Sequence, residues 1–510
     1  MTFLTNIYQS LTGQDLIIFA LTIFWIFYGY FNLKGSPKEL GIIYLTKVLE
    51  IIAYGLMSST LVLWLSQDLG FSDTKAGALI SVWSTIITLI TILVGSLTDS
   101  IGIKRSFLLG FGLCLISRFV MSQTVNLFVV LPFGLFLLAM GLAMMTPVMT
   151  AAVKAYASAK NRTLAFSLFY TFMNIGFAIS GVMFDNIRKS MGEAGVTRFL
   201  GQDYSTYRYM FILAFLFTIP GFLITFFGLR DGVSVDEKGN IEINPTVLQQ
   251  TEDQNQSMIN KMIALVKNTA SDTVVKFTNV MKQPSFHKFL LILTLLVGVR
   301  LVFYHMHYTF PKFAIRELGQ GAPIGQLWGV LNPVLIILLV PLVGSFSSKI
   351  SSYTMMFVGT TICSISLCFL VMPLDWFAGL ANGSLGHFIA NTWLQMNVKD
   401  VSPWYISITF FTVLMSIGEA IWSPRLYEYT ASIAPKGQEA TYMSLSMLPF
   451  FVAKFGVGLL SGALLSWYVP ETGERNSQML WLWVTLMAAI CPIGLFFGRK
   501  FLKTTEEGRA

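Results

Sequence analysis

Long apolar segments recur along almost the whole chain and decide what it can fold into. Thirteen runs fall near residues 15–32, 42–65, 76–98, 106–122, 127–154, 164–184, 209–229, 287–310, 325–347, 353–373, 403–424, 440–468 and 479–501. An apolar helix of about 20 residues crosses the hydrocarbon layer of a bilayer. The runs are continuously apolar rather than alternating, which excludes a membrane β-barrel, and a lipid-facing backbone must satisfy its own hydrogen bonds. The sequence therefore predicts an all-α polytopic, multi-pass integral membrane protein.

Composition and motifs exclude several other classes. Charged residues are only 12% of the 510 residues, against about 25% in a soluble protein. The four cysteines show no C-x-x-C or Cys/His spacing, so neither a zinc site nor a disulfide frame is predicted. No G-x-x-x-x-G-K-[ST], G-x-S-x-G or H-E-x-x-H motif occurs, so we predict neither an ATP-driven pump nor an enzyme, and no cofactor.

The distribution of basic residues predicts the orientation in the membrane. One set of loops and helix ends includes the central loop and the residues Lys34, Lys38, Lys104, Arg105, Lys160, Arg162, Lys349, Lys436, Arg499, Lys500 and Lys503, and the opposite set is sparser. By the positive-inside rule this set faces the cytoplasm, so the C-terminus is cytoplasmic and, with thirteen spans, the N-terminus is outside. The same rule explains the net charge of +8 without nucleic acid. It does not account for four cations of the opposite set, Arg188, Lys189, Arg198 and Arg208.

A polar stretch after residue 230 divides the chain. Residues 231–255 are acidic and predict a loop, and residues 258–281 have apolar residues at helical spacing, which predicts an amphipathic helix on the membrane surface. The first run lacks a basic leader and a cleavage site, so we interpret it as an extra helix rather than a signal peptide. The predicted parts are the extra N-terminal helix and linker (1–41), a six-helix bundle (42–230), the loop (231–286), a second six-helix bundle (287–501) and a tail (502–510).

Short internal repeats support two related halves. Residues 93–96, LVGS, recur at 342–345, and Gly141 followed by Thr146-Pro147 recurs as Gly418 followed by Ser423-Pro424. The repeats occupy the second and eighth, and the fourth and tenth, spans of the core. Two six-helix halves with a polar site between them are typical of carriers that work by alternating access.

The loop after the second core span carries a longer motif. Residues 95–105 read GSLTDSIGIKR, with Gly95, Asp99, Gly102, Lys104 and Arg105 at the spacing G-x-x-x-D-x-x-G-x-[RK]-[RK]. This resembles the signature of the major facilitator superfamily. The resemblance implies that fold, with twelve core helices, and a gating role for these five residues, which could lock the two halves together by ion pairing.

Four further segments are similar to the proton-dependent oligopeptide transporter family within that superfamily. They read LEIIAYGLM (49–57), FYTFMNIG (169–176), LNPVLIILLVP (331–341) and GEAIWSP (418–424, with a later Ala-Pro at 434–435). The resemblance implies proton-coupled uptake of peptides, with Glu419 receiving the substrate's amino group. The sequence departs from that pattern: the family's E-x-x-E-R is here Lys47, Glu50 and Ile51, and its lysine before proline is Thr146. Recognition of ordinary di- and tripeptides is therefore in doubt.

Ionisable residues inside apolar spans are costly and mark candidate functional positions. Lys47, Glu50 and Tyr54 are spaced to share one helix face. They form either a packed ion pair or a proton-sensitive couple, in which a substrate anion captures the lysine and leaves the carboxylate alone. We predict Glu50 as the main proton-coupling group.

The second half supplies the other candidates. Arg300, Tyr304 and His307 share a face, and Arg300 is a permanent cation suited to an anion, or else to Glu50 or Glu419. His307 could carry a proton, although His305 and His307 lie near the outer end and could equally be water-exposed. The predicted substrate-binding set is Lys47, Tyr54, Asn174, Arg300, Tyr304, Asn332, Glu419, Trp422, Ser423 and Lys454.

These features predict a secondary active transporter that couples protons to the symport of a small polar solute, zwitterionic or anionic and peptide-like. The partners expected are the solute, protons and the lipid of a plasma membrane or bacterial inner membrane, with no nucleic acid and no obligate protein partner. Two alternatives stay open: a proton-antiporting exporter of amphipathic compounds, and a membrane sensor or scaffold without turnover.

Overall fold

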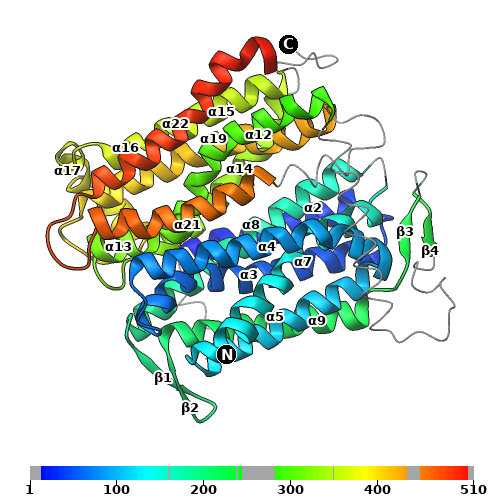
Figure 1. The fold of residues 1–510 in the computed structure, drawn as a ribbon, viewed down its shortest axis with the longest axis horizontal. Coiled ribbons are helices and arrows are strands. Elements are labelled where there is room, and N and C mark those ends of the chain that lie inside the picture. The colour runs from blue at the N-terminus through cyan, green and yellow to red at the C-terminus, as the bar shows by residue number, and fades with distance from the viewer. Residues whose placement is uncertain are drawn as a thin grey trace.

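The molecule consists of two helical bundles that lie side by side (Figure 1). The structure, a computed structural model, describes residues 13–158, 161–236, 239–243, 282–347, 350–433 and 448–502. We call residues 38–228 the N-bundle and residues 284–502 the C-bundle. The amphipathic helix predicted at 258–281 and the tail after residue 502 lie outside the described residues.

The N-bundle follows the predicted apolar runs. Its helices are α3 (Lys38–Gln67), α4 (Asp73–Ile101), α5 (Ile103–Gln123), the continuous unit of α6 (Leu127–Val129), η1 (Val130–Phe136) and α7 (Leu137–Tyr156), α8 (Arg162–Met191) and α9 (Thr206–Gly228). Ser72 and Ser205 begin α4 and α9 by accepting a hydrogen bond from the backbone three residues ahead. Gly102, with φ of 89°, separates α4 from α5 in a conformation that L-residues with a Cβ rarely adopt.

The C-bundle has the same order of long helices. They are α12 (Pro284–Tyr308), α13 (Phe310–Leu318), η2 (Gly325–Val330) with α14 (Leu331–Phe346), α15 (Ser352–Ser366) with α16 (Cys368–Val371), α19 (Pro403–Ile433), α21 (Leu448–Tyr468) and α22 (Ser477–Leu502). The short segments α17 (Asp375–Ala381), α18 (Ser384–His387) and η3 (Phe388–Trp393) connect α16 to α19.

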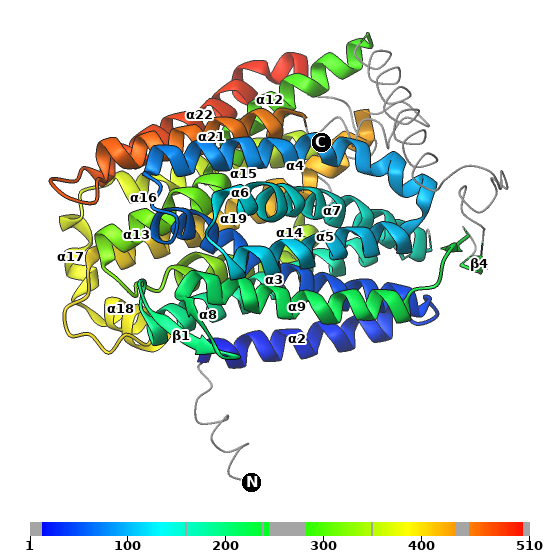
Figure 2. The same ribbon diagram turned by 60° about the horizontal axis from the view of Figure 1, so that its bottom comes forward.

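Twelve helices in the described part of the chain are long and apolar enough to cross a membrane, which confirms a multi-pass protein. They include α2 (Gly13–Asn32), which lies against α8 and η3 at the edge of the molecule and exposes much of its apolar surface (Figure 2). The 21-residue helix α21 is additional to these twelve. Where the structure describes them, the apolar runs predicted from the sequence lie mainly on helices, and residues 440–447 of one run lie outside the described residues.

Two β-hairpins mark the opposite ends of the bundles (Figure 1). The first pairs β1 (Val196–Phe199) with β2 (Gln202–Ser205), and the second pairs β3 (Val233–Val235) with β4 (Ile241–Ile243). The prediction of a loop over residues 231–255 is therefore wrong for Val233–Val235 and Ile241–Ile243, because the alternating β-branched residues of these two segments pair as strands. We name the two ends the β1–β2 face and the β3–β4 face.

The internal repeat reappears as the same close packing in both bundles. A Cβ added at Gly141 would lie 2.6 Å from Cys114 Sγ and 2.9 Å from the Gly110 carbonyl. At Gly418 it would lie 2.6 Å from Cys363 Sγ and 2.7 Å from the Gly359 carbonyl. The glycines therefore allow α7 to approach α5, and α19 to approach α15, in equivalent ways.

Two seams join the bundles, and both are rich in glycine. Along one, α4 lies beside α21, where Gly77 contacts Gly458 and Gly462, and Ser81 Oγ donates to the Phe455 carbonyl at 2.7 Å. Along the other, α8 lies beside η2, with Gly181 against Gly325. The candidate polar residues lie between these two seams.

Candidate functional site

The predicted Lys47–Glu50 couple is a buried ion pair on α3. Lys47 Nζ lies 3.4 Å from Glu50 Oε2, with the two residues 1% and 4% exposed. The Lys47 ammonium also lies 5.1 Å from the centroid of the Phe169 ring on α8. Tyr54, one turn further along α3, is close enough to interact electrostatically with Glu50 and with Tyr304 of α12. The α3 group therefore reaches the C-bundle through a pair of tyrosines.

Glu419, in the middle of α19, bridges the bundles. Its Oε1 accepts a hydrogen bond from Tyr170 Oη of α8 at 3.2 Å, and its Oε2 accepts one from Asn332 Nδ2 of α14 at 2.9 Å. Asn332 Nδ2 also donates to Ser416 Oγ at 2.9 Å. Glu419 is 8% exposed and interacts electrostatically with Arg300. The predicted residues Glu419, Asn332 and Arg300 thus lie together.

Two cations of the C-bundle lie against aromatic rings. The Arg300 guanidinium lies 5.1 Å from Trp422, 5.2 Å from Phe450 and 5.9 Å from Phe303, measured to the ring centroids. The Lys454 ammonium lies 5.7 Å from the Tyr304 ring and senses the charge of Arg300. Trp422 is fully buried, so it packs within the core as well as covering Arg300.

The other predicted residues occupy nearby positions. Asn174 donates to the Tyr170 carbonyl of its own helix at 2.8 Å, and Ser423 is buried one turn from Glu419. His307 is half-buried and interacts electrostatically with Lys454. His305 is completely buried and its Nδ1 shares a hydrogen bond of 2.7 Å with Thr309 Oγ1. The interpretation of His305 as water-exposed is therefore wrong, because the end of α12 is covered by the packed start of α13.

The cations of the G-x-x-x-D-x-x-G motif lie at the β3–β4 face. Arg105 pairs with Asp231 at 3.9 Å, and Lys104 lies 5.9 Å from the Phe226 ring, so both contact residues at or beyond the end of α9. Gly95 lies within α4, and the side chain of Asp99 lies outside the described atoms. A lock between the two bundles at this motif stays a prediction.

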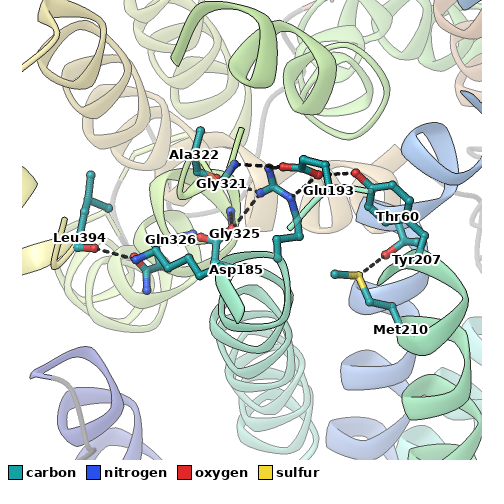
Figure 3. A network of polar contacts seen from close by, with 12 residues as sticks. Thr60, Asp185, Glu193, Tyr207, Met210, Gly321, Ala322, Gly325, Gln326 and Leu394 are labelled. Atoms are coloured by element: carbon teal, nitrogen blue, oxygen red, sulfur yellow. Dashed lines mark hydrogen bonds and ion pairs between the residues drawn. The ribbon is translucent and has the colours of Figure 1, made fainter. Parts of the chain in front are cut away.

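A polar network at the β1–β2 face was not predicted from the sequence (Figure 3). Asp185, near the end of α8, accepts hydrogen bonds from two backbone amides that begin η2, at 2.9 Å from Gly325 and 2.7 Å from Gln326. Arg188 Nη1 lies 3.4 Å from Asp185 Oδ1 and donates to the Ala322 carbonyl at 2.8 Å. Both residues are only 1% exposed, so the network is buried between the bundles.

Glu193 completes this network. It accepts hydrogen bonds from Arg188 Nε at 3.1 Å and from the Gly321 amide at 3.2 Å, and it also accepts from Tyr207. Burial by itself raises the pKa of the Glu193 carboxyl, but the hydrogen bonds and positive charge of Arg188 outweigh burial and leave the pKa below its ordinary value. We call Asp185, Arg188 and Glu193 the outer triad, because the orientation predicted from the sequence places the β1–β2 face outside.

A second ionic contact closes the same face on the other seam. Asp73, at the start of α4, pairs with Lys312 at 2.6 Å and with Arg316 at 2.8 Å, both on α13. Lys312 also donates to Ser66. The hydrogen bonds and ion pairs between described residues of the two bundles lie at this face or at mid-depth. The structure is therefore closed at the β1–β2 face.

These contacts also explain the four cations that the orientation rule leaves out. Arg188 belongs to the outer triad, and Lys189 Nζ donates to the Leu394 carbonyl at 3.1 Å. Arg208 Nε and Nη2 donate to the Ser122 and Gln123 carbonyls at the end of α5. Arg198 lies directly opposite Asp203 in the β1–β2 pairing. The sequence signal for these contacts was the occurrence of basic residues on the face where cations are scarce. Such residues have structural partners in this protein.

Comparisons with known proteins agree with this architecture. The profile described as Major Facilitator Superfamily matches residues 43–403, whereas the search of curated proteins finds no match. A solved POT family transporter in complex with 5-aminolevulinic acid is 18% identical, with a TM-score of 0.64 over 92% of this chain and 97% of that one. A POT family transporter in complex with a thioalcohol-conjugated peptide is 17% identical, with a TM-score of 0.65 and the same coverage. The peptide transporter POT in complex with sulfate is 16% identical, with a TM-score of 0.64 over 91% and 95%.

At these identities the solved structures share the fold, while the profile covers well over half of the chain. The predicted resemblance in residues 95–105 lies within the matched range. This protein belongs to the major facilitator superfamily, whose members are secondary transporters rather than enzymes.

Proposed function

We propose that the protein couples proton movement to the symport of a small polar solute, zwitterionic or anionic and peptide-like, by alternating access. The observation that carries this proposal is the series of charged and tyrosine residues that crosses from one bundle to the other. It runs from Lys47 and Glu50 through Tyr54 and Tyr304 to Lys454, Arg300 and Glu419. Charged groups held at the junction of two moving halves can sense both a solute and a proton.

Glu50 is the proposed proton carrier. Its carboxylate is stabilised by Lys47 at 3.4 Å in a site almost without solvent. When a solute anion draws Lys47 away, the buried carboxylate loses its partner and binding of a proton becomes favourable. Protonation of Glu50 and binding of the anion are thereby coupled, and His307 is a second candidate for this role.

The proposed solute site is formed by Lys47, Tyr54, Asn174, Arg300, Tyr304, Asn332, Glu419, Trp422, Ser423 and Lys454. Arg300, Lys454 and Lys47 attract the negative end of the solute. Glu419 either receives an amino group, as the resemblance to peptide transporters implies, or holds Arg300 in place.

Orientation and gating follow from the same arrangement. The basic helix ends at the β3–β4 face, including Lys104, Arg105 and Arg499, support a cytoplasmic location of this face and of the C-terminus. The outer triad and the Asp73 contact then close the outer side, and residues 95–105 form the proposed inner gate. The family match begins at residue 43, after α2, which supports α2 as an extra helix ahead of the core.

Uptake into proteoliposomes under an imposed pH gradient tests the proposal. With alanylalanine, N-acetyl-alanylalanine and succinate as probes, we expect inward accumulation of at least one when the inside is alkaline. The variant Glu50→Gln is expected to retain exchange of labelled for unlabelled solute but to lose accumulation. Outward pumping would instead support an exporter, and no flux of any probe from a broad panel would support a sensor or scaffold.

A further inference from the structure

The charges at the junction of the bundles do not balance. Lys47 and Glu50 form a neutral pair at 3.4 Å. The remaining described groups are two cations, Arg300 and Lys454, and one acid, Glu419. Within the described part of the chain neither cation has a carboxylate within ion-pair distance. One positive charge at this site is therefore left without compensation, even when both carboxylates are ionised.

Glu419 is already occupied. Each of its carboxylate oxygens accepts a hydrogen bond, one from Tyr170 at 3.2 Å and one from Asn332 at 2.9 Å, and its negative charge interacts electrostatically with Arg300. An incoming ammonium group would have to compete with all three. The geometry favours Glu419 as a group that orients Arg300 rather than as a receptor for an amine.

Among the described residues, Arg300 correspondingly lacks a hydrogen-bond acceptor for one of its donors. Its Nε is buried and has no hydrogen-bond partner in the described structure. The groups around its guanidinium are the rings of Trp422, Phe450 and Phe303, whose faces attract the cation but supply no oxygen acceptor. An unpaired donor on a buried cation is costly, and an oxyanion is the group that would satisfy it.

Lys454 likewise has no carboxylate within ion-pair distance among the described residues. Its ammonium lies 5.7 Å from the Tyr304 ring and repels Arg300 rather than pairing with it. Two cations that repel each other at such a depth are stabilised together by one anion between them.

We propose that the transported solute is an organic anion with more negative than positive charge, bound through a carboxylate or phosph(on)ate by Arg300 and Lys454, and that it needs no amino group. This inference rests on the proposed function, because it takes the junction of the bundles as the solute site. It narrows the class of solute from zwitterionic or anionic to anionic.

Thermal unfolding of the purified full chain tests this without transport. Alanylalanine, N-acetyl-alanylalanine and alanylalanine amide share one skeleton. Alanylalanine carries no net charge, its N-acetyl form carries one negative charge and its amide carries one positive charge. Succinate carries two negative charges. A ligand that prefers the folded state raises the melting temperature, and at equal concentration a tighter ligand raises it more. We expect stabilisation by succinate and N-acetyl-alanylalanine, less by alanylalanine and none by the amide. Greater stabilisation by alanylalanine than by its N-acetyl form would overturn the proposal.

Variants make the assignment specific to the two cations. Arg300→Gln and Lys454→Gln are each expected to weaken succinate binding about 10-fold or more, because each removes one partner of a charge-assisted contact. Lys399→Gln, on an exposed loop, is the matched control and is expected to bind succinate as the parent does. Unchanged succinate affinity in both Arg300→Gln and Lys454→Gln would refute the site.

Glu419→Gln separates the two roles of that carboxylate. If it orients Arg300, its loss leaves anion binding within a few-fold of the parent or tightens it, because one negative charge is removed. If it receives an amine, its loss abolishes binding of alanylalanine and spares N-acetyl-alanylalanine. Binding of anions without pH-driven flux would count against the proposed function alone, whereas pH-driven uptake of alanylalanine in preference to anions would count against this inference alone.

Discussion

Asp185 offers the sharpest test of how the outer face is held closed. Its two carboxylate oxygens accept the amides of Gly325 and Gln326 across the junction of the bundles, at 2.9 and 2.7 Å. Asp185→Asn keeps the size of the side chain but replaces one acceptor oxygen with an amide NH2 group. This group is a donor, so it cannot accept the hydrogen bond from the backbone N–H opposite it. It also removes the negative charge next to Arg188.

The magnitude follows from these contacts. A hydrogen bond to a charged group contributes about 1.5–3 kcal/mol, and a neutral one about 0.5–1.5 kcal/mol. The variant loses one charged bond and converts the other to a neutral one, while Arg188 keeps Glu193. The closed state is therefore destabilised by about 3 kcal/mol, or about 100-fold in the equilibrium between closed and open outer faces. A conformation populated to about 1% would rise to about half of the molecules.

Distances between spin labels on the two bundles measure this change. Val196 of the β1–β2 hairpin and Trp376 of α17 are 67% and 69% exposed and lie at the same face, so cysteines there can be labelled after the native cysteines are replaced. We expect a single short distance in the parent and an added longer one in Asp185→Asn. The control is Asp400→Asn, which removes an exposed carboxylate just before α19 and outside the labelled hairpin. A distribution identical to that of the parent would refute the role given to Asp185.

Three further predictions follow from other contacts. Asp73→Asn should open the outer face as Asp185→Asn does, and the two effects should add in the same distance measurement because the residues belong to separate seams. As the pH falls through the lowered pKa of Glu193, the stabilising contribution of this carboxylate is lost, so the longer distance should gain population at acidic pH; an unchanged distance distribution at acidic pH would contradict the assignment. Gly418→Val should lower the melting temperature by an amount equivalent to about 1–3 kcal/mol, because an added Cβ would lie 2.6 Å from Cys363 Sγ, whereas the exposed Gly379→Val should not.

The helices were predictable because hydrophobic length dictates them. In a bilayer each apolar run has to become a helix, and the long helices of the described residues follow the runs. The glycine repeat was predictable for a related reason. Gly141 and Gly418 lie where two backbones approach too closely for a Cβ, and the same requirement recurs in both halves.

The candidate site was predictable only where the partners are close in sequence. The pairing of Lys47 with Glu50 follows from their spacing on one helix face. The hydrogen bond from Tyr170 to Glu419 joins residues 249 positions apart, and no local pattern specifies it. For the same reason the imbalance of charge around Arg300 becomes evident only when the contacts of Glu419 are known.

The outer triad was not predictable because its main partners are backbone groups. Asp185 binds amides at the start of η2, and Arg188 binds the Ala322 carbonyl, groups that every residue carries and no sequence pattern reveals. Only the presence of Arg188 on the face where basic residues are scarce pointed to a partner.

The seams and the closures together indicate how the bundles can move. At both seams the backbones approach closely at glycines, Gly77 with Gly458 along α4 and α21 and Gly181 with Gly325 along α8 and η2, so no side chain separates the backbones at these points. A junction of this kind can change its angle with little repacking, whereas interdigitated side chains would resist it. The polar contacts of Asp73 and Asp185 lie at the outer ends of these same seams. We therefore infer that the glycines let the bundles change their angle, and that the buried charges of Asp73 and Asp185 add to the apolar packing that holds this end closed.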